Sequence, residues 1–223
     1  MAKITNFATK PRFLHLSGHR SVKFSRTLQP PYYIYPMKKI VIFASGSGTN
    51  AQAILDHFKD SDQVQVSLIL SNNPHAGVLD RAKKAQVEGL SFNKFAFAKA
   101  GSIHKLLQEL QPDLIVLAGF LWKIPEFLVQ EFPDKIINIH PALLPKYGGK
   151  GMYGAHVHEA VVANKETESG ITIHYVNEHY DEGAIIKQAS CEVKSTDTAE
   201  DVAHKIHQLE HQNLPITIEE LLK

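Results

Sequence analysis

The chain has 223 residues, of which 43% are hydrophobic and 21% are charged, a composition typical of a globular protein with one sizeable buried core. Its formal net charge of +1 predicts no nucleic-acid partner and no anionic membrane surface as a partner. The single cysteine, Cys191, excludes an intramolecular disulfide and any metal site built from several cysteines. No apolar run approaches the roughly 18 residues that are needed to cross a bilayer.

Residues 1–36 differ in composition from the rest of the chain. They contain six basic residues and no Asp or Glu, and they end in a Pro-rich stretch at 29–33. We expect this extension to lie outside the fold and one domain to cover residues 37–223. The extension is either an organelle transit peptide or an upstream read-through with Met37 as the true initiator. Its few Ser and Arg residues favour the second interpretation and a cytoplasmic protein, whereas the first interpretation implies an organelle.

From residue 37 onward, short apolar runs alternate with helical patterns. The predicted strands cover 39–44, 64–70, 113–118 and 135–139, and the predicted helices cover 50–59, 76–87, 102–110, 125–131 and 154–163. This alternation is typical of βαβ units. It predicts an α/β fold, a single doubly wound domain with a mostly parallel sheet.

The C-terminal part departs from this alternation. Two β-rich runs at 170–176 and 184–193, joined by a turn at 181–183, predict an antiparallel hairpin added to the sheet. A last helix is predicted over about 198–212, with Asp197 or Thr198 as its N-cap and Glu200 and Asp201 in its first turn.

A glycine-rich loop follows the first predicted strand directly, with the sequence Ala-Ser-Gly-Ser-Gly-Thr-Asn-Ala at 44–51. A loop between a strand and a helix N-terminus can bind an anion, because unpaired backbone N–H groups point to one place. The loop formally fits the dinucleotide pattern Gly-x-Gly-x-x-Ala, but the second strand ends in Ser71-Asn72-Asn73, without an acid for a ribose hydroxyl. A monophosphate is therefore the favoured ligand, and the alternative is a tight turn without a ligand.

Two polar side chains end the fourth predicted strand. Asn138 and His140 are two residues apart, so they share one face at the carboxyl end of the strand, where ligands of such sheets bind. Taken alone, such a pair is more often structural than functional.

Four ordered motifs resemble the phosphoribosylglycinamide formyltransferase family. They are Ile-Phe-Ala-Ser-Gly-Ser-Gly-Thr-Asn at 42–50, Leu-Ala-Gly-Phe at 117–120, Asn-Ile-His-Pro-Ala-Leu-Leu-Pro at 138–145 and Tyr-Asp-Glu-Gly at 180–183. The resemblance covers residues 37 to about 215. It implies a Rossmann-like formyltransferase fold and an enzyme of purine synthesis. Such an enzyme transfers a formyl group from 10-formyltetrahydrofolate, its co-substrate, to the amine of N1-(5-phosphoribosyl)glycinamide.

The resemblance also implies roles for individual residues. The implied catalytic residues are Asn138, His140 and Asp181. The residues implied to bind the ribonucleotide are Gly48, Thr49 and Asn50 for its phosphate and Glu210 for its ribose, and those implied to bind the folate are Leu121, Ile124, Asn138, Asn177, Glu178, His179, Tyr180 and Asp181. The implied partners are small-molecule substrates, with no nucleic acid, membrane, metal or nicotinamide, and a monomer and a homodimer both stay open.

The chemistry of formyl transfer suits these residue types. The nucleophile is the amine of the substrate, so the protein has to stabilise an oxyanion and move a proton. Asn138 and a protonated His140 can donate hydrogen bonds to the oxyanion. Asp181, if it lies close to His140, favours the imidazolium and can hold a water that relays protons.

Several different functions stay open at this point. A sister folate enzyme, either a methionyl-tRNA formyltransferase or a 10-formyltetrahydrofolate hydrolase, shares the three polar residues, although we expect no room here for the additional domains of those enzymes. A nicotinamide-dependent dehydrogenase and a non-catalytic nucleotide-binding module also stay open. The segment 146–154 is either a mobile lid or an ordered connector rich in turns.

The chain contains 13 histidines, which raises the question of a metal site. His204, His207 and His211 lie on roughly one face of the last predicted helix, and His156 and His158 form a His-x-His pair. No His-Glu-x-x-His motif accompanies them, so we favour solvent-exposed histidines and predict no metal site.

Overall fold

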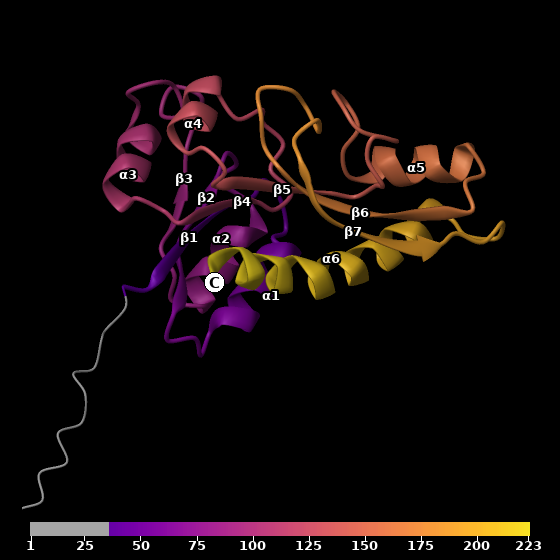
Figure 1. Cartoon of the computed structure of the whole chain (residues 1–223), viewed down its shortest axis with the longest axis horizontal. Helices are drawn as coiled ribbons and strands as arrows, with labels where there is room; N and C mark the ends of the chain where they lie inside the picture. Colours follow the sequence, from indigo (N-terminus) through magenta and orange to yellow (C-terminus); the bar gives the residue numbers. More distant parts are fainter. Residues whose placement is uncertain (1–35) are drawn as a thin grey trace, which may run out of the picture. The chain divides into compact units, whose positions relative to one another are not determined.

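The computed structural model describes residues 36–223, and the prediction that residues 1–36 lie outside the fold therefore falls almost wholly outside the described residues. No helix in the described part is both long enough and apolar enough to cross a membrane. The elements, labelled in Figure 1, are β1 (Lys38–Phe43), α1 (Thr49–Phe58), β2 (Val64–Ser71), α2 (Gly77–Lys84), β3 (Gly89–Ser91), α3 (Ser102–Leu110), β4 (Leu114–Leu117), α4 (Glu126–Glu131), β5 (Ile136–His140), α5 (Ala155–Ala163), β6 (Glu168–Tyr175), β7 (Ile185–Glu192) and α6 (Ala199–Leu222).

Within residues 36–223, the strands form one seven-stranded sheet in the order β3-β2-β1-β4-β5-β6-β7. The pairs from β3 to β5 are parallel, and β6 and β7 each pair antiparallel with the preceding strand. The predicted doubly wound α/β fold and its antiparallel hairpin are thus confirmed. The analysis of the sequence missed β3, because three half-exposed residues at a sheet edge carry no measurable periodicity.

The sheet separates two hydrophobic cores. Successive residues of β1 alternate between them, because side chains of a strand point to opposite faces. Ile40 and Ile42 pack in the core that α1 and α6 cover, whereas Val41 and Phe43 pack in the core that α3 and α4 cover. Figure 1 shows these two pairs of helices on opposite sides of the sheet.

The last helix, α6, begins where it was predicted to begin but ends ten residues later, at Leu222 instead of about residue 212. Pro215 lies inside the helix, where it lacks the N–H that would bond the preceding turn. The helix continues because Leu214 and Ile218, on either side of the proline, are fully buried in the core. Tertiary packing therefore outweighs the local cost of the proline.

The start of α6 carries a capping box, which selects Thr198 over Asp197 as the N-cap. The Thr198 hydroxyl accepts a hydrogen bond from the backbone N–H of Asp201, and the Asp201 carboxylate accepts one from the backbone N–H of Thr198. Two N–H groups that the helix leaves unpaired are thereby satisfied.

We expect Thr198→Ala to lower the free energy of unfolding by about 1 kcal/mol, because the loss of an N-cap typically costs that much. Urea denaturation monitored by circular dichroism measures the change. The control is Thr196→Ala, at an exposed position two residues earlier. Equal effects of the two substitutions would contradict a role of the cap.

The order of the strands also determines where a ligand can bind. The chain runs outward from β1 to β2 and β3, and it then returns to place β4 on the other side of β1. The loops that follow β1 and β4 therefore separate above the sheet and leave a crevice at the carboxyl ends of the strands. Ser45 and Gly119, one from each loop, are joined by a backbone hydrogen bond of 3.0 Å at its base.

Candidate active site

A cavity of about 490 Å³ lies at this crevice. Its walls come from the loops after β1, β4 and β5, from the segment 149–154, from the loop between β6 and β7, and from α6. Of the residues predicted to form the site, Glu178 is the one that does not line the cavity. The others do line it, and they are Gly48, Thr49, Asn50, Leu121, Ile124, Asn138, His140, Asn177, His179, Tyr180, Asp181 and Glu210.

The glycine-rich loop turns directly into α1, and Gly48 is the residue that makes this turn possible. Its φ of 75° lies in the left-handed region, and a Cβ at this position would lie 2.5 Å from Cγ2 of Val78. The first N–H groups of α1 have no partner within the helix, and Thr49 and Asn50, which carry two of them, line the cavity. Arg81 supports the loop from behind, because its Nε donates to the carbonyl oxygen of Ser47 at 2.7 Å. The loop thus has the geometry of an anion site.

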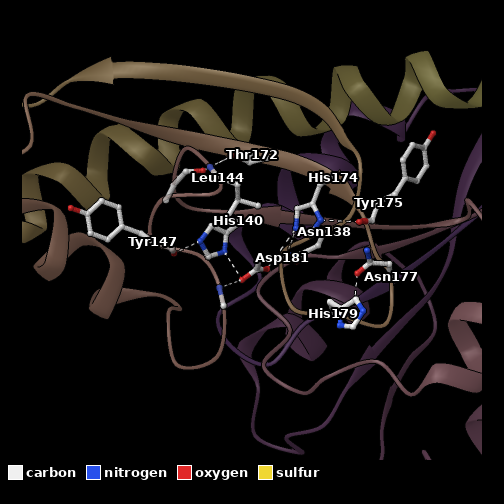
Figure 2. Close-up of polar contacts among 12 residues, drawn as sticks. Asn138, His140, Leu144, Tyr147, Thr172, His174, Tyr175, Asn177, His179 and Asp181 are labelled. Atoms are coloured by element: carbon white, nitrogen blue, oxygen red, sulfur yellow. Dashed lines mark hydrogen bonds and ion pairs between the residues drawn. The ribbon is translucent and has the colours of Figure 1, made fainter.

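His140 and Asp181 both line the cavity, and their side chains face each other (Figure 2). Nε2 of His140 donates to the carbonyl oxygen of Tyr147 at 2.7 Å, and this contact fixes the tautomer because a carbonyl oxygen only accepts. Nδ1 of His140 then faces Oδ2 of Asp181 at 3.7 Å, with both side chains largely buried. The same Oδ2 accepts a hydrogen bond of 2.8 Å from the backbone N–H of Gly149. A proton that is added to His140 therefore resides at Nδ1, beside the carboxylate.

Asn138 is oriented by a histidine that the sequence analysis did not identify. The antiparallel register of β5 and β6 places His174 opposite Asn138. Nδ1 of His174 donates to the carbonyl oxygen of Tyr175 at 2.9 Å, which leaves Nε2 to accept from Nδ2 of Asn138 at 3.1 Å. Burial lowers the pKa of His174, so the ring is neutral and can accept. One hydrogen of the Asn138 amide remains for a ligand in the cavity.

Asp181 also lies 3.7 Å from Nε2 of His174, so it sits between two imidazoles (Figure 2). The turn that carries it leaves little freedom. Asp181 itself has a φ of 57°, and a Cβ on Gly183 would lie 1.7 Å from the carbonyl oxygen of Tyr175. A glycine is required at 183 because the backbone approaches β6 so closely. The motif at 180–183 therefore aims the carboxylate at the two histidines.

The family model of formyl transferases matches residues 38–218. The chain belongs to the formyl transferase family. It is 39% identical over 181 residues to a chloroplastic phosphoribosylglycinamide formyltransferase of Arabidopsis thaliana, an alignment that covers 78% of this chain and 62% of that relative. It is 37% identical to the phosphoribosylglycinamide formyltransferase of Bacillus subtilis, over 83% of this chain and 95% of that one.

A solved structure agrees with this assignment. The glycinamide ribonucleotide transformylase 1 of Geobacillus kaustophilus superposes with a TM-score of 0.77 at 35% identity, over 84% of this chain and 100% of that chain. This formyl transferase thus shares both the sequence pattern and the fold of these relatives, although it spans less than two thirds of the length of the plant protein.

Asn50 and Glu210, which both line the cavity of this formyl transferase, form a buried polar pair. Nδ2 of Asn50 donates to Oε2 of Glu210 at 3.0 Å. Burial raises the pKa of Glu210 to about 7, an effect that the hydrogen bond from Asn50 only partly offsets. Near neutral pH the carboxyl group is therefore available both as a donor and as an acceptor, which suits recognition of hydroxyl groups.

The pKa of Glu210 predicts a dependence of stability on pH. A pKa raised from 4.5 to about 7 stabilises the fold below pH 4.5, and this contribution is lost as the pH rises through 7. As the pH rises from 4.5 to about 7, the titration of Glu210 alone lowers the free energy of unfolding by about 3 kcal/mol. We expect Glu210→Gln to remove that component. Urea denaturation between pH 5 and 8 measures it, with Glu220→Gln on the exposed face of α6 as the control. Parallel pH profiles for the wild type and Glu210→Gln would contradict the prediction.

Two further histidines, His158 and His207, also line the cavity. The prediction of a solvent-exposed His158 is wrong, because the side chain is 4% exposed, and its Nδ1 has no hydrogen-bond partner within the described part of the chain. Burial lowers its pKa to about 4, so the ring is neutral. His207 lines the mouth of the cavity and is exposed, as are His204 and His211. Among residues 36–223, no group of three or more His, Cys, Asp or Glu side chains is arranged to hold a metal ion.

Proposed function

We propose that this formyl transferase transfers a formyl group from 10-formyltetrahydrofolate to the amine of N1-(5-phosphoribosyl)glycinamide, a step of purine synthesis, and that residues 37–223 are its catalytic domain. The observation that carries the proposal is a single cavity that joins an anion-binding helix N-terminus to the group of Asn138, His140 and Asp181. The names of the relatives from Arabidopsis thaliana and Bacillus subtilis support the choice of substrates.

The two ends of the cavity suit the two substrates. The backbone N–H groups of Gly48, Thr49 and Asn50 bind the phosphate of the ribonucleotide, and Glu210 binds its ribose hydroxyls. The opposite end suits a planar apolar ring system, because the 57% exposed Leu121 and the buried Ile124 both line the cavity. The loop over 177–181 supplies polar groups at that end.

The reaction requires no nucleophile from the protein. The amine nitrogen of the ribonucleotide attacks the formyl carbon, the bond from that carbon to the folate N10 breaks, and one proton passes from the amine to N10. Negative charge develops on the formyl oxygen in between. The free amide hydrogen of Asn138 and the Nδ1–H of protonated His140 are donors for this oxygen. The Asp181 carboxylate stabilises positive charge on His140 and accepts the proton by way of a water.

A direct assay tests the proposal. The protein is mixed with a 10-formyl folate, with and without glycinamide ribonucleotide, and the loss of the formyl group is followed by ultraviolet absorbance. Deformylation that requires the ribonucleotide supports the transferase. Deformylation without it indicates a hydrolase, and no deformylation in either mixture indicates a binding module. The proposed chemistry uses no metal and no nicotinamide. We therefore expect a chelator to leave the rate unchanged and the assay to need no added nicotinamide cofactor.

We expect Asn138→Ala to lower kcat by about 10²–10³, the usual effect of removing one donor to an oxyanion. The KM for the ribonucleotide should change little, because the phosphate and the ribose bind elsewhere. Steady-state kinetics measures both constants. The control is Asn73→Ala, at an exposed asparagine that follows β2 and does not line the cavity. A wild-type kcat for Asn138→Ala would contradict the assigned role.

We propose the cytoplasm as the compartment, because residues 1–36 contain few of the Ser and Arg residues that are typical of a transit peptide. The chloroplastic relatives keep an organelle as the alternative if residues 1–36 act as a transit peptide. A fluorescent fusion of the full chain and of residues 37–223, expressed in a eukaryotic cell, distinguishes the two.

A further inference from the structure

One short segment, residues 146–149, contacts both halves of the His140–Asp181 pair. The carbonyl oxygen of Tyr147 accepts from Nε2 of His140 at 2.7 Å, and the N–H of Gly149 donates to Oδ2 of Asp181 at 2.8 Å. The backbone of this segment therefore sets the tautomer of His140, the orientation of the Asp181 carboxylate and the 3.7 Å between them.

This backbone is held in an unfavourable conformation. Tyr147 has a φ of 56°, in the left-handed region, which is unfavourable for a residue other than glycine. The neighbouring Gly148 is packed so closely that a Cβ there would lie 2.5 Å from Cδ2 of Leu144. A conformation of this kind persists only where the surrounding contacts enforce it.

The contact that enforces it lies on the side of Tyr147 that faces away from the cavity. The Tyr147 hydroxyl donates to Oε1 of Glu166 at 3.0 Å, and Nζ of Lys146 donates to the same carboxylate at 3.2 Å. Glu166 lies in the turn between α5 and β6, and its own N–H donates to the carbonyl oxygen of Val161 at 3.1 Å. The hydrogen bond from Tyr147 holds the pKa of Glu166 below its ordinary value. A charged acceptor gives a strong hydrogen bond and connects the segment to the rigid end of α5.

We propose that Tyr147 and Glu166 are positioning residues of the active site. The hydrogen bond between the phenol and the carboxylate holds the segment 146–149, and this segment holds His140 as the Nε2–H tautomer with Nδ1 toward Asp181. Neither Tyr147 nor Glu166 lines the cavity, so neither is assigned a contact with substrate. Only the expected change in kcat rests on the proposed function, because the tautomer of His140 is measurable without any substrate.

Lys146 provides an internal comparison. Its ammonium group binds the same carboxylate, but its side chain is 68% exposed, and surface ion pairs of this kind contribute little. Tyr147 instead is half-buried and packs against the core. We therefore assign the positioning to the phenol and not to the ammonium group.

The decisive variant is Tyr147→Phe, which keeps the ring and removes only the hydroxyl. We expect kcat to fall about tenfold or more, since small misplacements of reacting groups have large effects on rate, while the KM for the ribonucleotide stays within about twofold. Glu166→Ala should have the same effect. The double variant should be no slower than either single variant, because each single substitution already removes the hydrogen bond between the phenol and the carboxylate. Glu166→Gln should keep most of the rate, since its amide oxygen still accepts from the phenol. Lys146→Met should keep the wild-type rate.

Nitrogen-15 NMR of protein labelled at histidine provides the readout that a merely structural role would not move. The His140 signal, assigned by its loss in His140→Asn, should show the Nε2–H tautomer in the wild type and a mixture of tautomers in Tyr147→Phe, with melting temperatures measured in parallel. An unchanged His140 tautomer in Tyr147→Phe, or an unchanged kcat, would overturn the proposal. If the tautomer shifts as expected but the wild type transfers no formyl group, the positioning stands and the proposed function fails.

Discussion

The burial of β1 on both faces is the constraint on which the rest of the structure depends. Its residues alternate between two hydrophobic cores, so helices must cover both faces of the sheet. After building β2 and β3 on one side of β1, the chain crosses back to the other side. That return places β4 beside β1 and opens the crevice at the carboxyl ends of the two strands. The cavity is thus a consequence of how the sheet is covered, and its position follows before any polar residue is considered.

Within the cavity, backbone carbonyl groups decide what the side chains can do. Tyr147 and Tyr175 each accept from one ring nitrogen of a histidine, which leaves the other nitrogen of each ring directed into the site. In His140 the remaining nitrogen, Nδ1, can take up a proton next to Asp181. In His174 the remaining nitrogen, Nε2, accepts a hydrogen bond from Asn138 and orients its amide. Two histidines on the paired strands β5 and β6 therefore have opposite roles, because the backbone carbonyl groups bind different ring nitrogens, Nε2 of His140 and Nδ1 of His174.

The part of the cavity next to α1 has a different chemistry, and it is the part that we propose binds the phosphate. Backbone N–H groups at the start of α1 supply the positive end of the helix dipole without a buried charge, and Glu210 reaches the same end as a largely desolvated carboxyl group. The group around Asp181 instead combines a carboxylate with two imidazoles. Under the proposed function, the cavity therefore separates the group that binds the ribonucleotide from the group that acts on the formyl carbon.

The sequence by itself determined the fold class and most element boundaries, since periodicity is a local property, and all but one of the site residues that its family motifs implied line the cavity. It could not identify His174 or Tyr147. His174 reaches Asn138 through the antiparallel register of β5 and β6, and Tyr147 acts through a carbonyl oxygen that every residue has. It also ended α6 too early, because Pro215 carries a local penalty while the compensating burial of its neighbours comes from distant parts of the chain. Only the tertiary structure decided these points, because register, backbone direction and packing are relations between segments far apart in the sequence.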